Sequence, residues 1–551
     1  MFLRTVTKKN GKQYHYVLKS VRKKGKTHPV QITVADLTGL PEKIIQVIGA
    51  MLKGKDVTFQ KSPSTLVKVL STRYFAPLWI AIHFWLDLKV SSLSFFTKKE
   101  FKNLTALVLA RTVEAVECRS ELRTESWLRK SALHLIIGGG PNQWTRDDFY
   151  PLLTKLAQNW EKVEEHLWKQ RSSVPRLYLY DITSTYFEGK GGHYAALGYS
   201  RDEKRSNPQL VLALVADQDG IPIALRILPG NTKDSTTVKD AISDLKNRFG
   251  AQKAVMIMDR GMNTEGNLEE LQGSDLDYVL ALPHKQAREF LLSHNADLQW
   301  DLFDQRHIAE WVENDKRYIL CRNPNAAHRD KKTRNRILGR AIERLEKLKN
   351  MVEKGRIKNR DKILVRVVKI LTQTKTEKYF QYNVETGQFS YEQTELTELL
   401  RLYEGCYVLQ TSLKKPTSKE EIDQSYRNQR EIEEVFKSCK DELHLRPNFH
   451  KKSDNIFGHI YLTFLAHLVK KRLELKLKTN GWSKKGSTFF TAFREITVNR
   501  IEVNSQSQDV ITELTPTQNT QAAFAGVTIP TGSLQRSLRS YLPKYLQRIL
   551  I

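Results

Sequence analysis

Cysteine is scarce in this chain of 551 residues, and the four that occur lie far apart: Cys118, Cys321, Cys406 and Cys439. No two form a Cys-x-x-Cys pair, so the sequence supports neither a zinc module nor a disulfide framework. Long apolar runs are also missing. The longest, Ala76–Leu88, contains His83 and Asp87 and is too short to span a bilayer. Residues Met1–Arg4 lack the start of an apolar secretory signal. We therefore expect a protein of the reducing cytoplasm, without a membrane partner.

Acidic residues are the other shortage. The 61 Asp and Glu residues stand against 89 Lys and Arg, which leaves a net charge of +28 and a pI near 9.7. Because this excess is spread along the chain, it points to a polyanionic partner, with nucleic acid ahead of an acidic membrane surface. The composition, 40% hydrophobic and 27% charged, is that of a globular protein long enough for several domains.

The hydrophobic pattern changes several times along the chain and predicts six regions. Residues 1–60 form a small basic β-rich region, and residues 61–170 contain helical runs such as Leu104–Val116 and Trp127–Ile137. This helical region is either a DNA-binding element or a packing domain with an ordinary basic surface. The remaining regions are the first part of an α/β core at 171–285, a basic insertion at 286–404, the second part of the core at 405–475, and a C-terminal region at 476–551.

The stretch from residue 176 to 282 has the element order of a ribonuclease-H-like α/β domain. A strand at Leu177–Tyr180 leads into Asp181, and a hairpin follows at 210–228, around the turn Asp217–Gly220. A helix at 234–249 precedes the apolar run Ala254–Met258, which is typical of a buried central strand and ends at Asp259. A helix near 264–273 and a strand at 278–282 complete the order. The pattern places Asp181 and Asp259 at the ends of two central strands.

The insertion contains a strongly basic segment. Residues 329–362 hold fourteen Lys and Arg and five Asp and Glu, a local net charge of +9 by subtraction. Leu338, Ile342, Leu345, Leu348 and Val352 recur at helical spacing, which predicts an amphipathic helix with a basic face. That face is either a solvated surface or a DNA contact. Further on, residues 456–469 read as an apolar core helix that includes His459 and His467.

Residues 419–441 read as a single helix that carries the third candidate carboxylate, Glu433. Ser418 and Glu421 provide a capping box at its start. Tyr426, Glu433 and Lys440 are each seven residues apart and so fall on one stripe of the helix. The stripe is either an ordinary solvated face or a surface for a nucleic-acid backbone.

Asp181, Asp259 and Glu433 form a combination suited to phosphoryl transfer. Mg²⁺ prefers oxygen ligands, and two such ions can activate an attacking oxygen and stabilise a leaving one. The competing carboxylates have simpler roles, since the hairpin turn accounts for Asp217 and Asp219, while Asp202 and Asp234 fit loop or N-cap positions. Residues 189–192 lack the spacing of a Walker A motif, which argues against a nucleotide triphosphate site.

The motifs around these carboxylates resemble those of the DDE transposases of bacterial and archaeal insertion sequences, in the insertion-sequence-four superfamily. The resemblance covers roughly residues 176–475. Asp181–Gly189 looks like the first-Asp motif, Met258–Met262 like the second, and the helix like the tyrosine–arginine–glutamate–lysine signature, Y-x2-R-x3-E-x6-K. Tyr426, Glu433 and Lys440 are in register with that signature. Gln429 stands at the arginine position and Arg430 is displaced by one residue. Further similar segments are Gly198–Ser200, Pro208–Val211, Pro229–Asp234, Leu445–Pro447 and Gly458–Leu462.

The resemblance implies a ribonuclease-H-like catalytic core with a large insertion between the second Asp and the Glu. It implies Asp181, Asp259 and Glu433 as catalytic ligands of two Mg²⁺ or Mn²⁺ ions. The reaction would be cleavage at the terminal inverted repeats of an element, followed by joining of the 3′-OH ends to target DNA. The implied partners are double-stranded DNA, both ends and target, and a second copy of the chain on that DNA. The expected DNA contacts are Tyr426, Gln429, Arg430, Lys437, Lys440 and Arg446.

Two other functions remain open on the sequence. The same carboxylates would serve a metal-dependent DNA nuclease that does not join strands. A catalytically inactive DNA-binding protein derived from a transposase is the second alternative, although the complete set of three carboxylates argues against it.

Overall fold

The computed structural model of the protein describes most of the chain. The described residues are 1–8, 11–22, 28–54, 67–294, 307–313, 316–395, 397, 401, 403–482, 484–503 and 505–550. Parts of the predicted N-terminal region and of the predicted insertion, 295–306 among them, therefore lie outside the described residues. The boundaries of the six regions remain predictions.

The centre of the molecule is an eight-stranded mixed sheet in the order β10-β11-β14-β9-β8-β5-β6-β7. The strands β5 (Leu177–Tyr186), β8 (Val255–Met258) and β9 (Asp277–Ala281) run parallel, whereas β6 (Gln209–Asp217) and β7 (Pro222–Pro229) continue from β5 as an antiparallel meander. Every residue of β6 is buried, as expected for a central strand covered on both faces. The order β7-β6-β5-β8-β9 is the ribonuclease-H-like arrangement, which confirms the predicted fold class.

Helices cover both faces of this sheet. Tyr178 and Tyr180 of β5 face one layer, in which α8 (Val238–Ser243) and α9 (Glu265–Gln272) pack. Leu177 and Leu179 face the opposite layer, which contains α15 (Gln429–Lys437) and α16 (Ser453–Thr479). This alternation follows from the two-residue period of a strand. The helices predicted at 234–249 and 264–273 are confirmed, and the first of them continues as a π-helical turn, Asp244–Arg248.

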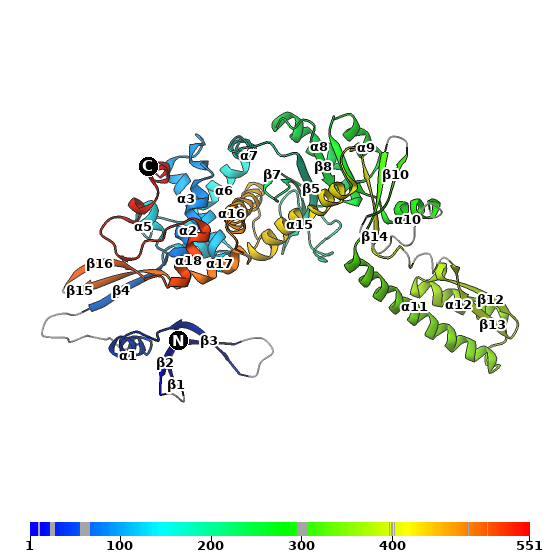
Figure 1. Ribbon diagram of the computed structural model, residues 1–551, viewed down its shortest axis with the longest axis horizontal. Coiled ribbons are helices and arrows are strands. Elements are labelled where there is room, and N and C mark those ends of the chain that lie inside the picture. Colours follow the sequence, from blue (N-terminus) through cyan, green and yellow to red (C-terminus); the bar gives the residue numbers. More distant parts are fainter. Residues whose placement is uncertain are drawn as a thin grey trace.

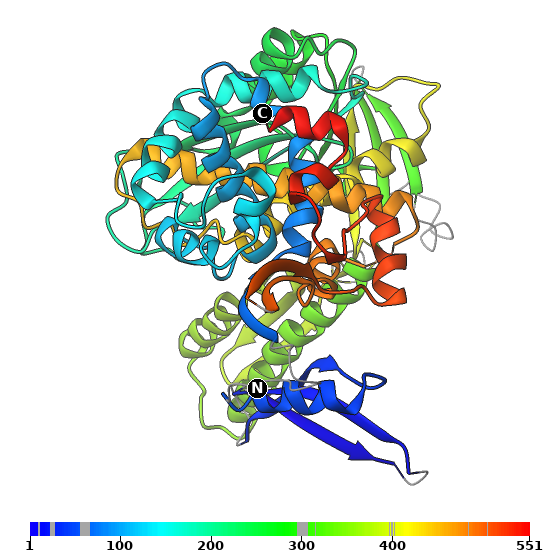
Figure 2. The same cartoon turned by 90° about the vertical axis from the view of Figure 1, so that its left-hand side faces the viewer.

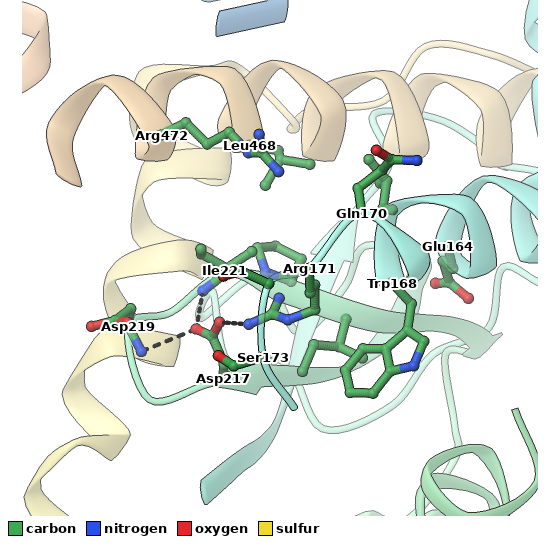
Figure 3. A pocket seen from close by; sticks show the side chains of 14 residues that line it. Glu164, Trp168, Gln170, Arg171, Ser173, Asp217, Asp219, Ile221, Leu468 and Arg472 are labelled. Atoms are coloured by element: carbon green, nitrogen blue, oxygen red, sulfur yellow. Dashed lines mark hydrogen bonds and ion pairs between the residues drawn. The ribbon is translucent and has the colours of Figure 1, made fainter. Parts of the chain in front are cut away.

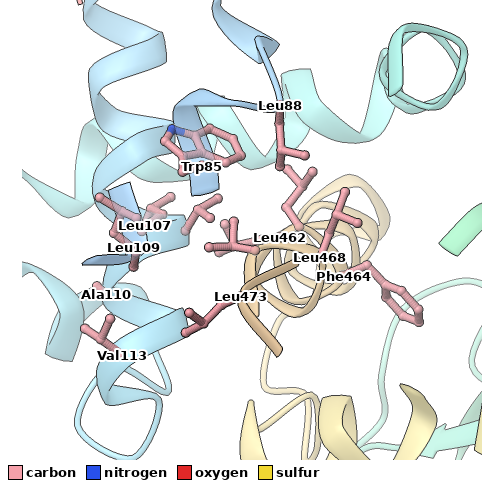
Figure 4. Packing of buried hydrophobic residues seen from close by; sticks show 14 of the residues in the cluster. Trp85, Leu88, Leu107, Leu109, Ala110, Val113, Leu462, Phe464, Leu468 and Leu473 are labelled. Carbon is pink, nitrogen blue, oxygen red and sulfur yellow. The ribbon is translucent and has the colours of Figure 1, made fainter. Parts of the chain in front are cut away.

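The long helix α16 joins the sheet to the helical region before it. Its Leu462, Leu468 and Leu473 lie among side chains of α2 (Ala76–Leu86) and α3 (Lys98–Glu114), including Trp85 and Leu107 (Figure 4). Because α16 contains apolar residues on all sides, it is buried along most of its length, as the sequence predicts for 456–469. The remaining helices of this region are α4 (Glu121–Leu128), α5 (Leu133–Ile137), α6 (Arg146–Gln158) and α7 (Trp160–Lys169).

The predicted helical run Trp127–Ile137 is wrong in its middle. The helix α4 stops at Leu128, because the backbone of the next segment bonds to strand β4 (Val67–Tyr74). The Tyr74 N–H donates to the Lys130 carbonyl at 3.3 Å, and the Ala132 N–H donates to the Tyr74 carbonyl at 2.8 Å. These long-range bonds replace helical ones, and periodicity alone contains no sign of them.

The basic insertion forms an arm with its own core. Helices α11 (Pro324–Glu353) and α12 (Arg360–Thr374) pack with the hairpin β12 (Phe380–Glu385) and β13 (Gln388–Gln393). Figure 1 shows this arm extending away from the sheet. The predicted amphipathic helix is therefore two helices, separated near Gly355, which has a φ of +69° that favours glycine. Leu338, Leu345, Leu348 and Val352 face the arm's core, as their spacing predicts.

The sheet also extends further than the sequence predicts. Strands β10 (His307–Glu313) and β11 (Lys316–Arg322) pair with each other, and β11 pairs with β14 (Cys406–Thr411). Two strands of the predicted insertion are thus part of the central sheet.

The two ends of the chain form smaller sheets. Strands β1 (Phe2–Thr7), β2 (Gln13–Val21) and β3 (Val30–Asp36) form an antiparallel sheet with helix α1 (Glu42–Met51), drawn apart from the main body in Figures 1 and 2. The strand β4 instead pairs with β15 (Thr497–Val503), from the C-terminal region. The other C-terminal elements are α17 (Gly486–Ala492), β16 (Gln506–Ile511), α18 (Pro516–Ala525), β17 (Gly532–Ser533) and α19 (Lys544–Ile549). Over the described ranges, no helix has the length and apolar character needed to cross a membrane.

Candidate active site

Asp181 and Asp259 occupy matching positions on two neighbouring parallel strands. Tyr180 of β5 is the register partner of Met258 of β8, and each of these residues is followed in the chain by one of the aspartates. Neighbouring strands lie about 4.8 Å apart, so the two side chains begin at about that separation. Asp259 follows the end of β8, as predicted. The prediction that Asp181 ends a strand is wrong, because β5 continues to Tyr186, paired with β6 alone.

Both aspartates face the layer that contains α15. Asp181 alternates with Leu177 and Leu179, which belong to that layer, and Asp259 lies two residues after Ile257, which belongs to it as well. On α15 the buried side is formed by Ile432, Val435 and Phe436. Glu433 lies on the exposed side of the same helix.

The charges of the three carboxylates act on one another. Burial raises the pKa of Asp181 to about 7, and the negative charges of Asp259 and Glu433 add to the rise, against a hydrogen bond from the Ile182 N–H at 2.7 Å. Burial also raises the pKa of Glu433, and the charge of Asp259 contributes in the same direction. The structure thus brings the three sequence-predicted ligands into one electrostatic cluster.

The Glu433 helix is not the single helix that the sequence predicts. The capping box is confirmed, since the Glu421 N–H donates to Ser418 Oγ at 3.1 Å and the Ser418 N–H donates to Glu421 Oε2 at 2.8 Å. The first helix, α14 (Lys419–Arg427), ends at Asn428, where α15 begins. A π-helical turn, Ser438–Glu442, follows α15. These irregularities change the directions in which the side chains point, so the predicted stripe is not one continuous exposed surface.

Lys440 lies inside the protein rather than on that stripe. Its Nζ donates to Thr183 Oγ1 at 2.7 Å and to Asp202 Oδ1 at 2.8 Å, and the residue is 9% exposed. Arg446 also forms an ion pair with Asp202, whose side chain is 4% exposed. Burial lowers the pKa of Lys440, and Asp202 opposes this shift. Asp202 lies in a turn, as predicted, but its carboxylate also holds two of the cations expected to contact DNA.

The other residues expected to contact DNA differ in exposure. Arg430 and Lys437 are exposed, Tyr426 is half-buried with its ring centroid 5.9 Å from that of Tyr407, and Gln429 is buried. Their roles in DNA binding remain predictions.

Three side chains around the carboxylates were not predicted from the sequence, namely Arg260, His284 and Arg201. Arg260 Nε lies 3.8 Å from Asp259 Oδ1, and its guanidinium contacts the His284 ring. Arg201 binds both carboxylate oxygens of Asp234 at 2.6 Å, and its charge lowers the pKa of Asp181. Asp234 starts a short 3₁₀ turn, which agrees with its predicted loop position. The available signal was proximity in sequence, because Arg260 lies within the second-Asp motif and Arg201 directly follows the segment Gly198–Ser200.

The hairpin turn accounts for Asp217, as predicted. Asp217 Oδ1 accepts hydrogen bonds from the N–H groups of Asp219 and Ile221 at 3.0 and 2.8 Å, and Arg171 pairs with the other oxygen (Figure 3). These residues line a cavity of about 380 Å³ that none of the three candidate ligands lines. This cavity is therefore separate from the carboxylate cluster.

The carboxylate cluster fits a hard divalent cation. All three donors are carboxylate oxygens, which Mg²⁺ and Mn²⁺ prefer. The Asp259 side chain is 51% exposed, so the cluster is open to solvent and substrate. Burial and then mutual repulsion raise the pKa of Asp181 and Glu433, and a bound cation opposes both effects.

We expect the Asp181→Asn variant to be more stable than the wild type at pH 8 without divalent metal, by about 4 kcal/mol. The folded protein holds the Asp181 proton up to about pH 7, whereas the ordinary pKa of an aspartate is 3.8. The wild-type free energy of unfolding therefore falls as pH rises through this window, and the variant lacks that loss. Chemical denaturation at pH 4 and pH 8 checks the prediction. An equal difference at both pH values would contradict it.

The fold and the site together define a ribonuclease-H-like protein with a cluster of three acidic residues over its central strands. The chain belongs to the transposase DDE domain family, whose model matches residues 172–469. That match spans all three carboxylates.

Two solved structures are similar to the chain at low identity. A piggyBac transposase synaptic complex with hairpin DNA is 9% identical, with a TM-score of 0.37, over 86% of this chain and 84% of that chain. A Mos1 transposase paired-end complex with a left transposon end is 13% identical, with a TM-score of 0.15, over 45% of this chain and 68% of that one. No curated protein is similar to the sequence. The strand order β7-β6-β5-β8-β9 supports the fold assignment by itself.

Proposed function

We propose that the protein is a transposase of the insertion-sequence-four superfamily, from a bacterial or archaeal element, acting on DNA in the cytoplasm. It would cleave DNA at the terminal inverted repeats and join the freed 3′-OH ends to target DNA by two-metal phosphoryl transfer. The observation that supports this proposal best is the matched register of Asp181 and Asp259 beneath the helix that carries Glu433. The membership of the DDE domain family supports it independently.

In this proposal Asp181, Asp259 and Glu433 hold two Mg²⁺ or Mn²⁺ ions. When bound, such a pair activates the attacking oxygen and stabilises the leaving one. The protein itself contributes by positioning these ligands. Two ligands come from adjacent strands of a buried sheet, where side chains are held better than on loops. The third comes from a helix packed on the same sheet face through Ile432 and Phe436.

DNA is the proposed partner, as ends and as target, bound by a homodimer. Arg430 and Lys437 are exposed on the helix of Glu433 and suit backbone contact. Four other expected DNA contacts are partly or fully buried: Tyr426, Gln429, Lys440 and Arg446. We propose that these side chains support the exposed surface, or that they contact DNA after the protein rearranges. The net charge of +28 and the basic arm supply further cations for phosphates.

We expect DNA binding to fall steeply with salt. For each phosphate neutralised, log K should drop by about 0.9 per tenfold rise in salt concentration. Filter binding or fluorescence anisotropy between low and physiological salt checks this. Affinity that does not respond to salt would contradict binding through the basic surface.

The decisive experiment is Mg²⁺- or Mn²⁺-dependent cleavage and joining of DNA that carries the element's flanking ends, with the wild type compared to Asp181→Asn. Cutting followed by joining, both lost in the variant, is the expected result. Cutting without joining would favour a metal-dependent nuclease. Binding without chemistry under either metal would favour a catalytically inactive DNA-binding protein.

A further inference from the structure

A second group of potential metal ligands lies away from the carboxylate cluster. Glu121 begins helix α4, His450 lies in the segment before α16, and His459 lies within α16. One ligand atom from each of the three residues lies within 4.8 Å of the others. The sequence predicts His459 as part of an apolar core helix, and its scattered cysteines predict no zinc module. The side chains here come from three distant parts of the chain.

The separations within this group suit a shared ion better than hydrogen bonds. Glu121 Oε2 lies 3.4 Å from His450 Nε2, and Glu121 Oε1 lies 3.7 Å from His459 Nδ1. Hydrogen bonds of this kind are usually about 2.7–3.2 Å long. Two atoms that each lie about 2.1 Å from a tetrahedral zinc are about 3.4 Å apart. The two carboxylate–imidazole distances are therefore longer than usual hydrogen bonds and close to the separation of two ligands on one cation.

The group is also buried and lacks other partners. The side chains of Glu121 and His459 are 3% and 4% exposed, and that of His450 is 12% exposed. Among the described residues, Glu121 Oε1 and both ring nitrogens of His459 have no hydrogen-bond partner. Leaving buried polar atoms without hydrogen bonds costs folding free energy, so a ligand shared by Glu121 Oε1 and the His459 ring would remove that cost.

The surrounding charges leave the Glu121 carboxylate available. Arg111 faces the group, but its Nη1 donates to the backbone carbonyls of Leu443 and His444, at 3.2 and 3.5 Å. The Tyr150 ring also approaches, with its centroid 6.1 Å from that of His450.

We propose that Glu121, His450 and His459 form a structural site for one Zn²⁺ ion. Two imidazole nitrogens and a carboxylate are a donor set that zinc accepts, whereas Mg²⁺ prefers oxygen ligands alone. The ion would fasten α4 of the helical region to α16 and to the segment that leads from the Glu433 helix into α16. It would therefore hold the helical region against the catalytic core without taking part in the reaction.

The test uses the full-length protein in an Asp181→Asn background, stripped with a chelator and then titrated with Zn²⁺ or Co²⁺. This background removes a ligand of the carboxylate cluster. The expected result is one bound Zn²⁺ per chain by mass spectrometry, a Co²⁺ absorption spectrum typical of nitrogen and oxygen ligands, and a rise in Tm of about 5 °C at saturating Zn²⁺. The proposal would be overturned if Zn²⁺ did not bind tightly. It would also be overturned if one Zn²⁺ per chain bound to the protein with Asp181 intact but not to the Asp181→Asn variant.

A matched pair of variants assigns the site. His459→Asn and His467→Asn alter two histidines of the same helix that are equally buried, and both rings lack hydrogen-bond partners in the described part of the chain. We expect Zn²⁺ binding to be lost in His459→Asn and kept in His467→Asn. His450→Ala, on the more exposed segment, provides the same test if His459→Asn does not fold. Unchanged Zn²⁺ binding in His450→Ala would reject the site.

Discussion

Replacing Glu433 with glutamine is expected to reduce cleavage of DNA ends by about 10³-fold, equivalent to about 4 kcal/mol of transition-state stabilisation. The side-chain amide keeps the shape of Glu433 but loses the charge that a divalent cation requires. The packing of α15 through Ile432 and Phe436 should remain. Binding of DNA ends is therefore expected to survive while cutting fails.

Glu434→Gln is the matched control, because Glu434 is the next residue of the same helix, is exposed, and lies 3.7 Å from Lys437 on the surface. Gel-based cleavage and anisotropy binding with the same DNA separate the two steps. If Glu433→Gln cuts at the wild-type rate, the ligand assignment is wrong. If both variants lose cutting equally, the effect belongs to the helix surface and not to Glu433.

Replacing Lys440 with methionine is expected to destabilise the folded protein by about 3 kcal/mol, because removing one member of a buried ion pair leaves the other partly uncompensated. Lys440 Nζ contacts Asp202 and Thr183 within the protein. In the described part of the chain, Asp202 is left with the ion pair to Arg446 when the amine is removed. Chemical denaturation measures the change. The resemblance to transposases assigns Lys440 to DNA phosphate instead, and the two roles make different predictions.

Lys437→Met controls for the loss of one positive charge, because Lys437 is exposed on the same segment. This substitution should change the free energy of unfolding by less than about 0.5 kcal/mol. Combining Lys440→Met with Asp202→Asn tests the pair directly, and the two effects should be clearly less than additive. Loss of DNA affinity in Lys440→Met at unchanged stability would favour the phosphate role over the structural one.

The order of the core elements could be predicted from the sequence because it depends on local patterns. The apolar run Ala254–Met258 and the turn at Asp217–Gly220 specify a buried strand and a hairpin without reference to distant residues. The strand expected at Leu177–Tyr180 and the run Ala254–Met258 assigned Asp181 and Asp259 to two central strands. Parallel pairing of β5 and β8 determined which residues are neighbours, and this required the structure.

Features that depend on distant side chains could not be predicted. The burial of Lys440 depends on Asp202, from a turn far earlier in the chain. The inclusion of β10 and β11 in the sheet depends on pairing with β14, on the other side of the arm. The group of Glu121, His450 and His459 has no sequence spacing at all, because three separate segments supply it. In each case the relevant contact is made by tertiary packing and not by periodicity.

The attachment of the arm has a consequence for how such chains can vary. Arg322, at the end of β11, and Cys406, at the start of β14, are register partners, and the Asn323 N–H donates to the Gly405 carbonyl at 2.8 Å. The intervening residues therefore leave and re-enter the sheet at one point, like the loop of a hairpin. Doubling such a loop costs only about 0.6 kcal/mol of closure entropy. Related chains can thus gain, lose or exchange whole folded segments at this point while the distance between Asp259 and Glu433 stays constant. The number of residues between the two ligands therefore carries no information about the geometry of the site.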